Sequence, residues 1–132
     1  MQDYHFTFEP GEITLRQPYV SKEMVLERLK DLIEENYKEI RDPMFYSNAL
    51  AYGLRSLNIL CQAYTGRTVF GLVQERLIIE AERLLVGTGM NTKLIAFELC
   101  FYDPAYFCKF FKQMRGMTPG EYRRCMTIRA SL

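Results

Sequence analysis

The residues that most often do chemistry in proteins are few in this sequence and lie far apart along it. Its four cysteines, Cys61, Cys100, Cys108 and Cys125, form no Cys-x-x-Cys pair, and its single histidine, His5, lies near the N-terminus. A structural zinc site needs four such ligands, usually in closely spaced pairs. No Ser-His-Asp arrangement or phosphate-binding loop is present either. The sequence therefore predicts no enzyme, no catalytic residue, no metal site and no cofactor. The cysteines are expected to be reduced core thiols, with a redox-sensing pair as the alternative.

The chain's 132 residues are enough for one compact domain with a hydrophobic core. Hydrophobic residues make up 48% and charged residues 25%, as in ordinary globular proteins and unlike disordered segments. No apolar run approaches the roughly 18–20 residues that span a bilayer. The first residues also lack the basic and apolar layout of a signal peptide, so a cytoplasmic location is expected.

Charge is distributed unevenly along the chain. Residues 1–42 carry ten acidic and six basic side chains, a net charge of −4, whereas residues 43–132 carry six acidic and eleven basic ones, a net charge of +5. A basic region is the electrostatic pattern expected of a surface that binds phosphate. A solvated charge asymmetry without function is the alternative interpretation.

The segment 92–123 has the pattern of two short amphipathic helices joined by a tight turn. Apolar residues recur at helical spacing on both sides of that turn, at Leu94, Ile95, Leu99 and Phe101 before it and at Phe107, Phe110 and Phe111 after it. Asp103 can cap a helix that begins with Pro104, Gly116 ends that helix, and Thr118-Pro119 begins another. A short helix, a turn and a second helix form the layout of a helix-turn-helix, whose second helix enters the DNA major groove.

Residues 44–66 repeat this pattern about 50 positions earlier. The matched pairs are Leu57 with Phe107, Leu60 with Phe110, Gly66 with Gly116 and Thr68 with Thr118 at an offset of 50, and Ser47 with Ala96 and Leu50 with Leu99 at an offset of 49. The sequence therefore predicts two helix-turn-helix units, the second with one extra residue in its turn. Chance repetition of helical periodicity is the alternative.

Further helices are expected before, between and after these units. Ser21 can cap a helix that runs to about Ile40, with an apolar stripe of Met24, Val25, Leu29, Leu32, Ile33 and Tyr37. Phe70–Val86 is expected to be a connecting helix, with a buried side of Leu72, Val73, Leu77, Ile78, Ala81, Leu84 and Leu85. Residues 1–19 alternate polar and apolar around Pro10-Gly11, a hairpin-like pattern, and the basic tail after Tyr122 is expected to begin as a helix.

The pattern resembles the C-terminal signature of the AraC/XylS family of bacterial transcription regulators. In the second unit the resemblance rests on Ile95-Ala96, Leu99-Cys100-Phe101, Asp103-Pro104, Tyr106-Phe107, Phe110-Phe111-Lys112, Gly116, Thr118-Pro119 and Tyr122-Arg123. In the first unit it rests on Leu57, Leu60-Cys61, Tyr64-Thr65-Gly66 and Arg76–Leu85. The family usually has glycine at the position of Cys100, serine at Tyr102 and Ser-Pro at Gly53-Leu54. Because glycine offers no side-chain oxygen, the first unit is expected to bind DNA less firmly.

The resemblance implies an all-α fold with two helix-turn-helix subdomains joined by a linker helix and preceded by a short extended or hairpin-like appendage. The expected divisions are an appendage or remnant of an upstream domain at 1–20 and a DNA-binding domain at 21–132. Within that domain the first helix-turn-helix is expected at 44–66, the linker helix at 69–87 and the second helix-turn-helix at 92–116.

Candidate DNA contacts follow from the resemblance and from side-chain chemistry. An arginine can donate two hydrogen bonds to guanine, an asparagine can pair with adenine, and small apolar groups can touch a thymine methyl. The expected base contacts are Arg55, Ser56, Asn58, Ile59, Ala105, Cys108 and Lys109. The expected phosphate contacts are Arg67, Thr68, Tyr106, Lys112, Arg115, Arg123 and Arg124. Solvated surface is the alternative for each cation, and a place in the core is the alternative for Tyr106.

The function expected from the resemblance is sequence-specific binding of double-stranded DNA by a bacterial transcription regulator. Two recognition helices would enter successive segments of the major groove. A helical module that binds another protein is the alternative function. Family members generally carry a sensing or dimerisation domain, so an upstream effector-binding or dimerisation domain and RNA polymerase are the other expected partners, and the chain is either a fragment of a longer regulator or a free-standing version.

Overall fold

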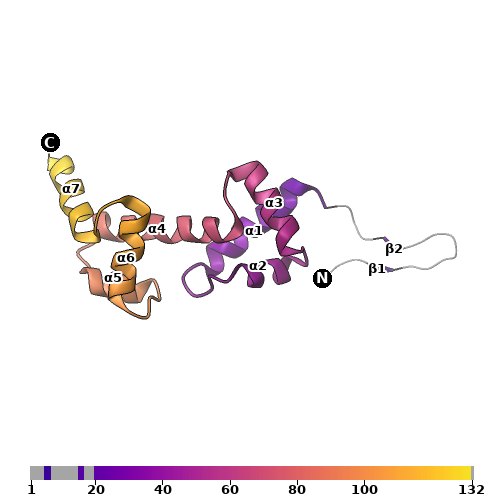
Figure 1. Cartoon of the computed structure of the whole chain (residues 1–132), viewed down its shortest axis with the longest axis horizontal. Helices are drawn as coiled ribbons and strands as arrows, with labels where there is room; N and C mark the ends of the chain where they lie inside the picture. Colours follow the sequence, from indigo (N-terminus) through magenta and orange to yellow (C-terminus); the bar gives the residue numbers. More distant parts are fainter. Residues whose placement is uncertain (1–4, 7–14, 17–19, 132) are drawn as a thin grey trace.

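The computed structural model of this protein describes residues 5–6, 15–16 and 20–131, and Figure 1 shows their arrangement. The elements are β1 (His5–Phe6), β2 (Leu15–Arg16), α1 (Lys22–Asn36), α2 (Pro43–Leu50), α3 (Leu54–Thr65), α4 (Val69–Gly87), α5 (Thr92–Glu98), α6 (Pro104–Arg115) and α7 (Pro119–Ser131). The predicted all-α class is confirmed, because each strand holds only two residues.

The two strands pair in antiparallel orientation, with His5 opposite Arg16 and Phe6 opposite Leu15. This pairing agrees with the hairpin-like pattern predicted for residues 1–19. The predicted turn at Pro10-Gly11 lies outside the residues that the structure describes.

The long helix α4 joins two groups of helices. In Figure 1, α1, α2 and α3 gather around one end of α4, and α5, α6 and α7 gather around the other. We call α2 and α3 the first unit, and α5 and α6 the second unit. The predicted buried side of α4 is confirmed except at Leu72, which is half-buried. One helix therefore contributes to the packing of both units.

Side chains cap most of these helices, as their residue types predict. The N-cap residues Ser21, Asp42, Thr68, Asn91 and Asp103 each accept a hydrogen bond from a backbone N–H in the first helical turn, at 2.8–3.2 Å. The first unit lacks such a bond at α3, where the cap is Gly53. At the other end of α3 and of α6, Gly66 (φ 77°) and Gly116 (φ 81°) adopt the left-handed conformation that ends a helix.

Three details of the predicted helices were wrong. Helix α1 ends at Asn36, four residues before Ile40, and the Asn36 side chain donates a hydrogen bond to the Leu32 carbonyl oxygen at 2.8 Å. Met24 is 46% exposed, because the buried stripe of α1 passes through Leu26 instead. Leu94 is 51% exposed, because α5 turns Ile95 and Ala96 inward.

The turns of the two units have closely similar backbones. Ala51 after α2 (φ 52°) and Cys100 after α5 (φ 63°) both adopt the left-handed conformation. In each unit the next residue's N–H donates to the carbonyl oxygen five positions earlier, at 3.1 Å and 2.9 Å. Helix α6 begins four residues after Cys100, whereas α3 begins three residues after Ala51. The predicted extra residue in the second turn is therefore confirmed, and Tyr102 within that turn is 94% exposed.

Replacing Cys100 by glycine should stabilise the protein. A left-handed L-residue costs about 1–2 kcal/mol, and the extra freedom of glycine in the unfolded chain offsets about 0.5–1 kcal/mol of that. We expect Cys100→Gly to raise the free energy of unfolding by about 0.5–1 kcal/mol in a urea titration.

The matched control is Cys125→Gly, which makes the same chemical change inside α7. This control should destabilise the protein, because glycine is a poor helix former. If both variants lost the same free energy of unfolding, the left-handed conformation of Cys100 would not be a source of strain.

Candidate DNA interface

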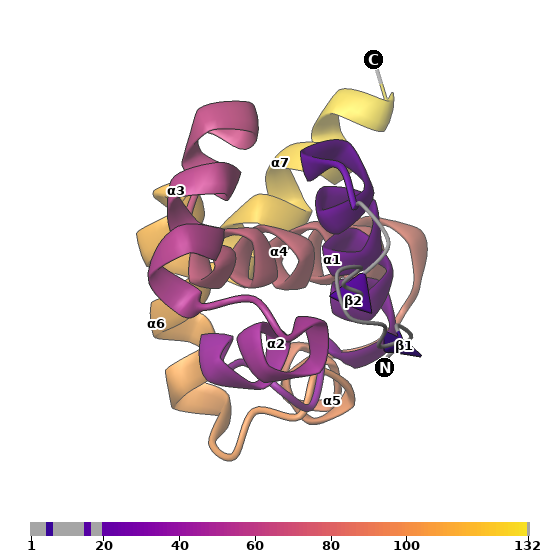
Figure 2. The same ribbon diagram turned by 90° about the vertical axis from the view of Figure 1, so that its right-hand side faces the viewer.

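The second helices of the two units lie on the same side of the molecule. Figure 2 shows α3 and α6 both at the left of the view, with α1 at the right. Helix α4 passes between the two groups (Figures 1 and 2). It packs against α3, and the Arg115–Glu82 ion pair links it to α6. A single ligand with two sites could therefore meet α3 and α6 together.

The outward face of α3 carries most of the side chains predicted for it. Leu57, Leu60 and Cys61 are buried and leave the opposite face in solvent. Arg55 and Ser56 are exposed at the start of this face, and Ile59 follows one turn later at 61% exposure. These three predicted contacts lie together on one accessible stripe.

Asn58 has a different position from the one predicted. Its side chain is half-buried, and its Oδ1 accepts a hydrogen bond from the Val69 N–H at 2.9 Å. A paired contact to adenine needs that same oxygen as an acceptor. Asn58 therefore caps the start of α4 in this structure, and its Oδ1 already accepts one hydrogen bond.

The outward face of α6 is poorer in strong donors. Phe107 and Phe111 are buried, while Ala105 and Lys109 are exposed and Cys108 is half-buried. Lys109 is the one of the three base-contact candidates with a charged donor. Tyr106 is 63% exposed, which excludes the core position considered as its alternative.

The predicted phosphate contacts fall into two groups. Lys112 and Arg124 are exposed, and Arg67 is also exposed, although its Nη2 lies 3.6 Å from Glu75 Oε1. Thr68 is occupied at the start of α4, where its Oγ1 accepts from the Gly71 N–H at 3.1 Å.

Arg115 and Arg123 belong to the second group, since both are occupied inside the protein. Arg115 donates from Nε to Glu82 at 2.6 Å, and this hydrogen bond raises the pKa of its guanidinium. Arg123 donates to the carbonyl oxygens of Leu85 at 2.8 Å, Thr88 at 3.3 Å and Met90 at 2.6 Å. These bonds attach α6 and α7 to α4 and the loop after it, so both guanidinium groups already have partners within the protein.

Ion pairs also attach α1 to α4. Arg76 forms two hydrogen bonds with Glu34 at 2.7 Å and 2.8 Å, and its guanidinium carbon lies 4.4 Å from the centre of the Tyr37 ring. Glu80 is 7% exposed, a buried charge that the sequence analysis missed. Hydrogen bonds with Arg83 lower the pKa of Glu80. In the same way, hydrogen bonds with Arg76 lower the pKa of Glu34. Glu80 is therefore buried with a paired charge.

Two exposed glutamines extend the outward faces and were missed by the sequence analysis. Gln62 lies seven residues after Arg55 and three after Ile59, and Gln113 lies four residues after Lys109. Each amide offers both a donor and an acceptor to a base edge. Continuing the helical spacing beyond the first turn would have found both.

Other kinds of site were also searched within the part of the chain that the structure describes. There, no three His, Cys, Asp or Glu side chains come together as a set that could hold a metal ion. None of the described helices has the length and apolar character needed to cross a bilayer.

Asn58→Ala should weaken folding rather than alter which bases are read. The substitution leaves the Val69 N–H without its acceptor, and losing a capping bond of this kind costs about 1 kcal/mol. Urea unfolding should show that loss, and DNA titrations below the unfolding transition should show the same order of preference among duplexes as the wild type. A change in the preferred base at one position would instead assign Asn58 to direct readout.

A family model described as a helix-turn-helix domain matches residues 46–125. The HTH-type transcriptional regulator YisR of Bacillus subtilis is 33% identical over 107 residues, which are 81% of this chain and 37% of that regulator. The chain thus spans little more than a third of that relative's length.

Solved structures give the same result for the fold. The C-terminal domain of the two-component response regulator yesN from Fusobacterium nucleatum superposes with a TM-score of 0.67 and is 26% identical, covering 74% of this chain and 96% of that one. The DNA-binding domain of AdpA, solved in complex with a target DNA, superposes with a TM-score of 0.69 and is 18% identical, covering 80% of this chain and 94% of that one. At this level of identity the similarity supports the fold alone. The matched region holds both turns and both second helices, α3 and α6, and this chain belongs to the AraC/XylS family of helix-turn-helix DNA-binding transcription regulators.

Proposed function

We propose that this chain is the sequence-specific DNA-binding part of a transcription regulator, and that α3 and α6 enter successive major-groove segments of one duplex. The observation that carries the proposal is the placement of both helices on one side of α4 (Figure 2). Exposed polar side chains lie on each helix, Arg55 and Ser56 on α3 and Lys109 on α6. A recognition helix needs this exposure, because it reads base edges from within the groove.

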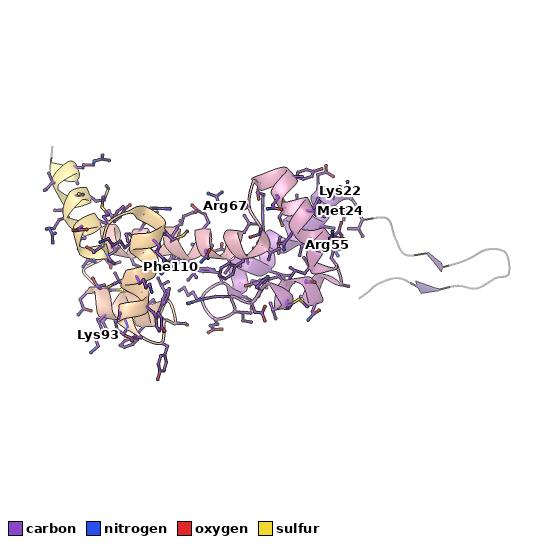
Figure 3. All side chains as sticks on the ribbon, in the orientation of Figure 1. Lys22, Met24, Arg55, Arg67, Lys93 and Phe110 are labelled. Carbon is purple, nitrogen blue, oxygen red and sulfur yellow. The ribbon has the colours of Figure 1, made fainter. Side chains whose placement is uncertain are left out.

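The first unit is the better candidate for direct readout. Figure 3 labels Arg55 on α3, near the end of the molecule opposite α7. An arginine there can donate two hydrogen bonds to guanine, and Gln62, two helical turns later, can pair with adenine. Ile59 between them can touch a thymine methyl, and Ser56 can donate or accept.

The second unit is suited to affinity and shape recognition. Lys109 can reach a guanine edge, whereas Ala105 and Cys108 offer small apolar contacts. Tyr106, 63% exposed, can donate its hydroxyl to a phosphate. Proteins also gain specificity from DNA shape at positions that they do not read directly.

A set of exposed cations completes the proposed interface. We assign Arg67, Lys112 and Arg124 to phosphate contacts and leave out Arg115 and Arg123, whose guanidinium groups already have partners inside the protein. Thr68 stays a weaker candidate, because its hydroxyl oxygen caps α4.

The rest of the regulator is proposed by analogy with the longer relatives. We propose an effector-binding or dimerisation domain elsewhere in the polypeptide, action in the cytoplasm, and RNA polymerase as a protein partner. No catalytic role is proposed for this domain, since the family and its relatives are transcription regulators.

Arg55→Ala should weaken binding to the preferred duplex and relax the choice of base at one position. Loss of a bidentate contact to guanine costs about 1–3 kcal/mol. The measurement is a fluorescence anisotropy titration on the duplex selected by the wild type and on its single-base variants.

Lys112→Ala is the control, because loss of a phosphate contact weakens binding about equally on all sequences. If Arg55→Ala also weakened binding about equally on all sequences, the assigned contact between Arg55 and a base would be wrong. A wild-type chain that bound random DNA no better than a neutral protein at low salt would contradict DNA binding altogether and favour the protein-interaction alternative.

Affinity should fall steeply with salt. If the three assigned cations Arg67, Lys112 and Arg124 each neutralise one phosphate, the slope of log affinity against log salt concentration is about −3. Lys112→Ala and Arg124→Ala should each make that slope shallower by about 1. Arg115→Ala should leave it unchanged, since its guanidinium is held by Glu82. An equal change in all three variants would contradict the division of the cations into two groups.

A further inference from the structure

The two units are joined at a second place besides α4, between the loop that follows α1 and the end of α5. Arg41 in that loop donates from Nη2 to the Leu99 carbonyl oxygen, and its guanidinium carbon lies 4.3 Å from the centre of the Phe101 ring. Nearby, Lys38 Nζ lies 3.2 Å from Glu98 Oε2. We call these five residues the inter-unit latch.

Arg41 makes the strongest contact of the latch. Leu99 is the C-cap of α5, where the last carbonyl groups lack partners within the helix and carry the negative end of its dipole. Arg41 also donates to the Lys38 carbonyl oxygen at 3.1 Å, so one guanidinium bridges its own loop and the other unit. Arg41 is half-buried, and this partial removal of its charge from water lowers the pKa of its guanidinium. Charge-assisted hydrogen bonds of this kind are stronger than exposed ion pairs such as Lys38–Glu98.

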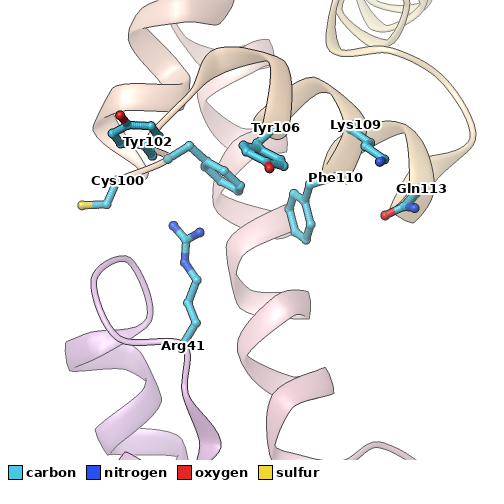
Figure 4. A pocket seen from close by; sticks show the side chains of 8 residues that line it. Arg41, Cys100, Tyr102, Tyr106, Lys109, Phe110 and Gln113 are labelled. Carbon is cyan, nitrogen blue, oxygen red and sulfur yellow. The ribbon is translucent and has the colours of Figure 1, made fainter.

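A cleft that is open to solvent lies beside the latch. Figure 4 shows Arg41 reaching from the first group of helices toward Cys100 and Tyr102, and Tyr106 and Phe110 of α6 line the same cleft. The volume of this cleft is about 560 Å³. Because side chains do not fill this space, tight apolar packing does not hold the two units together there. The polar contacts of Arg41 therefore carry the connection on this side of α4.

We propose that Arg41 is a positioning residue that holds α3 and α6 at one relative orientation, so that the chain binds its two DNA elements at one spacing. This inference rests on the proposed binding of both helices to one duplex. Two linked binding modules gain affinity when their geometry matches the spacing of their sites, and lose it when the geometry forbids simultaneous binding. Freeing the units from each other should weaken binding at the matched spacing and make other spacings less unfavourable.

The test measures the penalty for changing that spacing. The full chain selects its preferred duplex from random sequences, and two further duplexes carry one or two base pairs inserted between the two contacted elements. The spacing penalty is the ratio of the dissociation constant on an inserted duplex to that on the selected one. We expect a wild-type penalty of about 30-fold or more, and a penalty at least about fivefold smaller in Arg41→Ala.

Two further variants separate orientation from charge and from folding. Arg41→Lys keeps the positive charge and the apolar stem but lacks the two-nitrogen fork, so its penalty should also fall. Its smaller change in packing keeps the test available if Arg41→Ala does not fold, as judged by circular dichroism. Arg83→Ala is the control, because Arg83 is exposed and pairs with Glu80 within α4. Its penalty should equal that of the wild type.

The proposal would be overturned if Arg41→Ala or Arg41→Lys kept a spacing penalty as large as that of the wild type. It would also be overturned if the spacing penalty of Arg83→Ala fell as much as that of Arg41→Ala. A wild-type chain without sequence-specific binding would instead contradict the proposed function. A wild-type chain that binds specifically but has no spacing penalty would show that no fixed orientation is used, and would overturn the role of Arg41 alone.

Discussion

The burial of α4 against both units is the constraint on which the rest of the structure depends. Its 19 residues span about 28 Å at 1.5 Å per residue, which approaches the roughly 34–36 Å of one DNA turn. Its apolar residues run from Val69 near the start to Leu85 near the end. A helix with a shorter buried stripe could support one unit but could not place a second at this distance.

Ion pairs between helices supplement this apolar contact and fix specific positions along α4. Arg76 ties α1 to α4 through Glu34, and Arg115 ties α6 to α4 through Glu82. Glu75 lies between Arg67, at the exit of the first unit, and Arg115, at the end of the second. Part of the positive charge of residues 43–132 is therefore balanced inside the protein, and the net charge overstates how many cations are available to DNA.

Local features of the fold could be predicted from the sequence because each depends on few neighbouring residues. The caps Ser21 and Asp103, the glycine exits of α3 and α6, and the longer second turn all follow from short patterns. The outward position of Arg55 was predictable for the same reason, since helical spacing alone fixes which side of α3 is buried.

Partners that are distant in sequence could not be predicted in this way. Arg123 meets carbonyl groups 33–38 residues earlier, and Asn58 meets an N–H eleven residues later. Because these partners are not visible in the local pattern, both side chains were predicted to face DNA. Glu80 was missed for another reason: both of its arginine partners lie on α4 itself, but nothing in that local pattern marks this carboxylate as covered by the rest of the fold. Polarity alone does not distinguish a side chain that meets solvent from one that completes the fold, because both need hydrogen-bond partners.

The unequal outward faces of α3 and α6 give the domain a direction on DNA. One end presents Arg55, Ile59 and Gln62, and the other presents Ala105 and Lys109, so a single chain has no two-fold axis to match a palindrome. A duplex inverted end for end would offer its base edges to the wrong helix. One copy of this chain would therefore bind its site in a single orientation. Any further domain of the same polypeptide would then lie on a fixed side of that site.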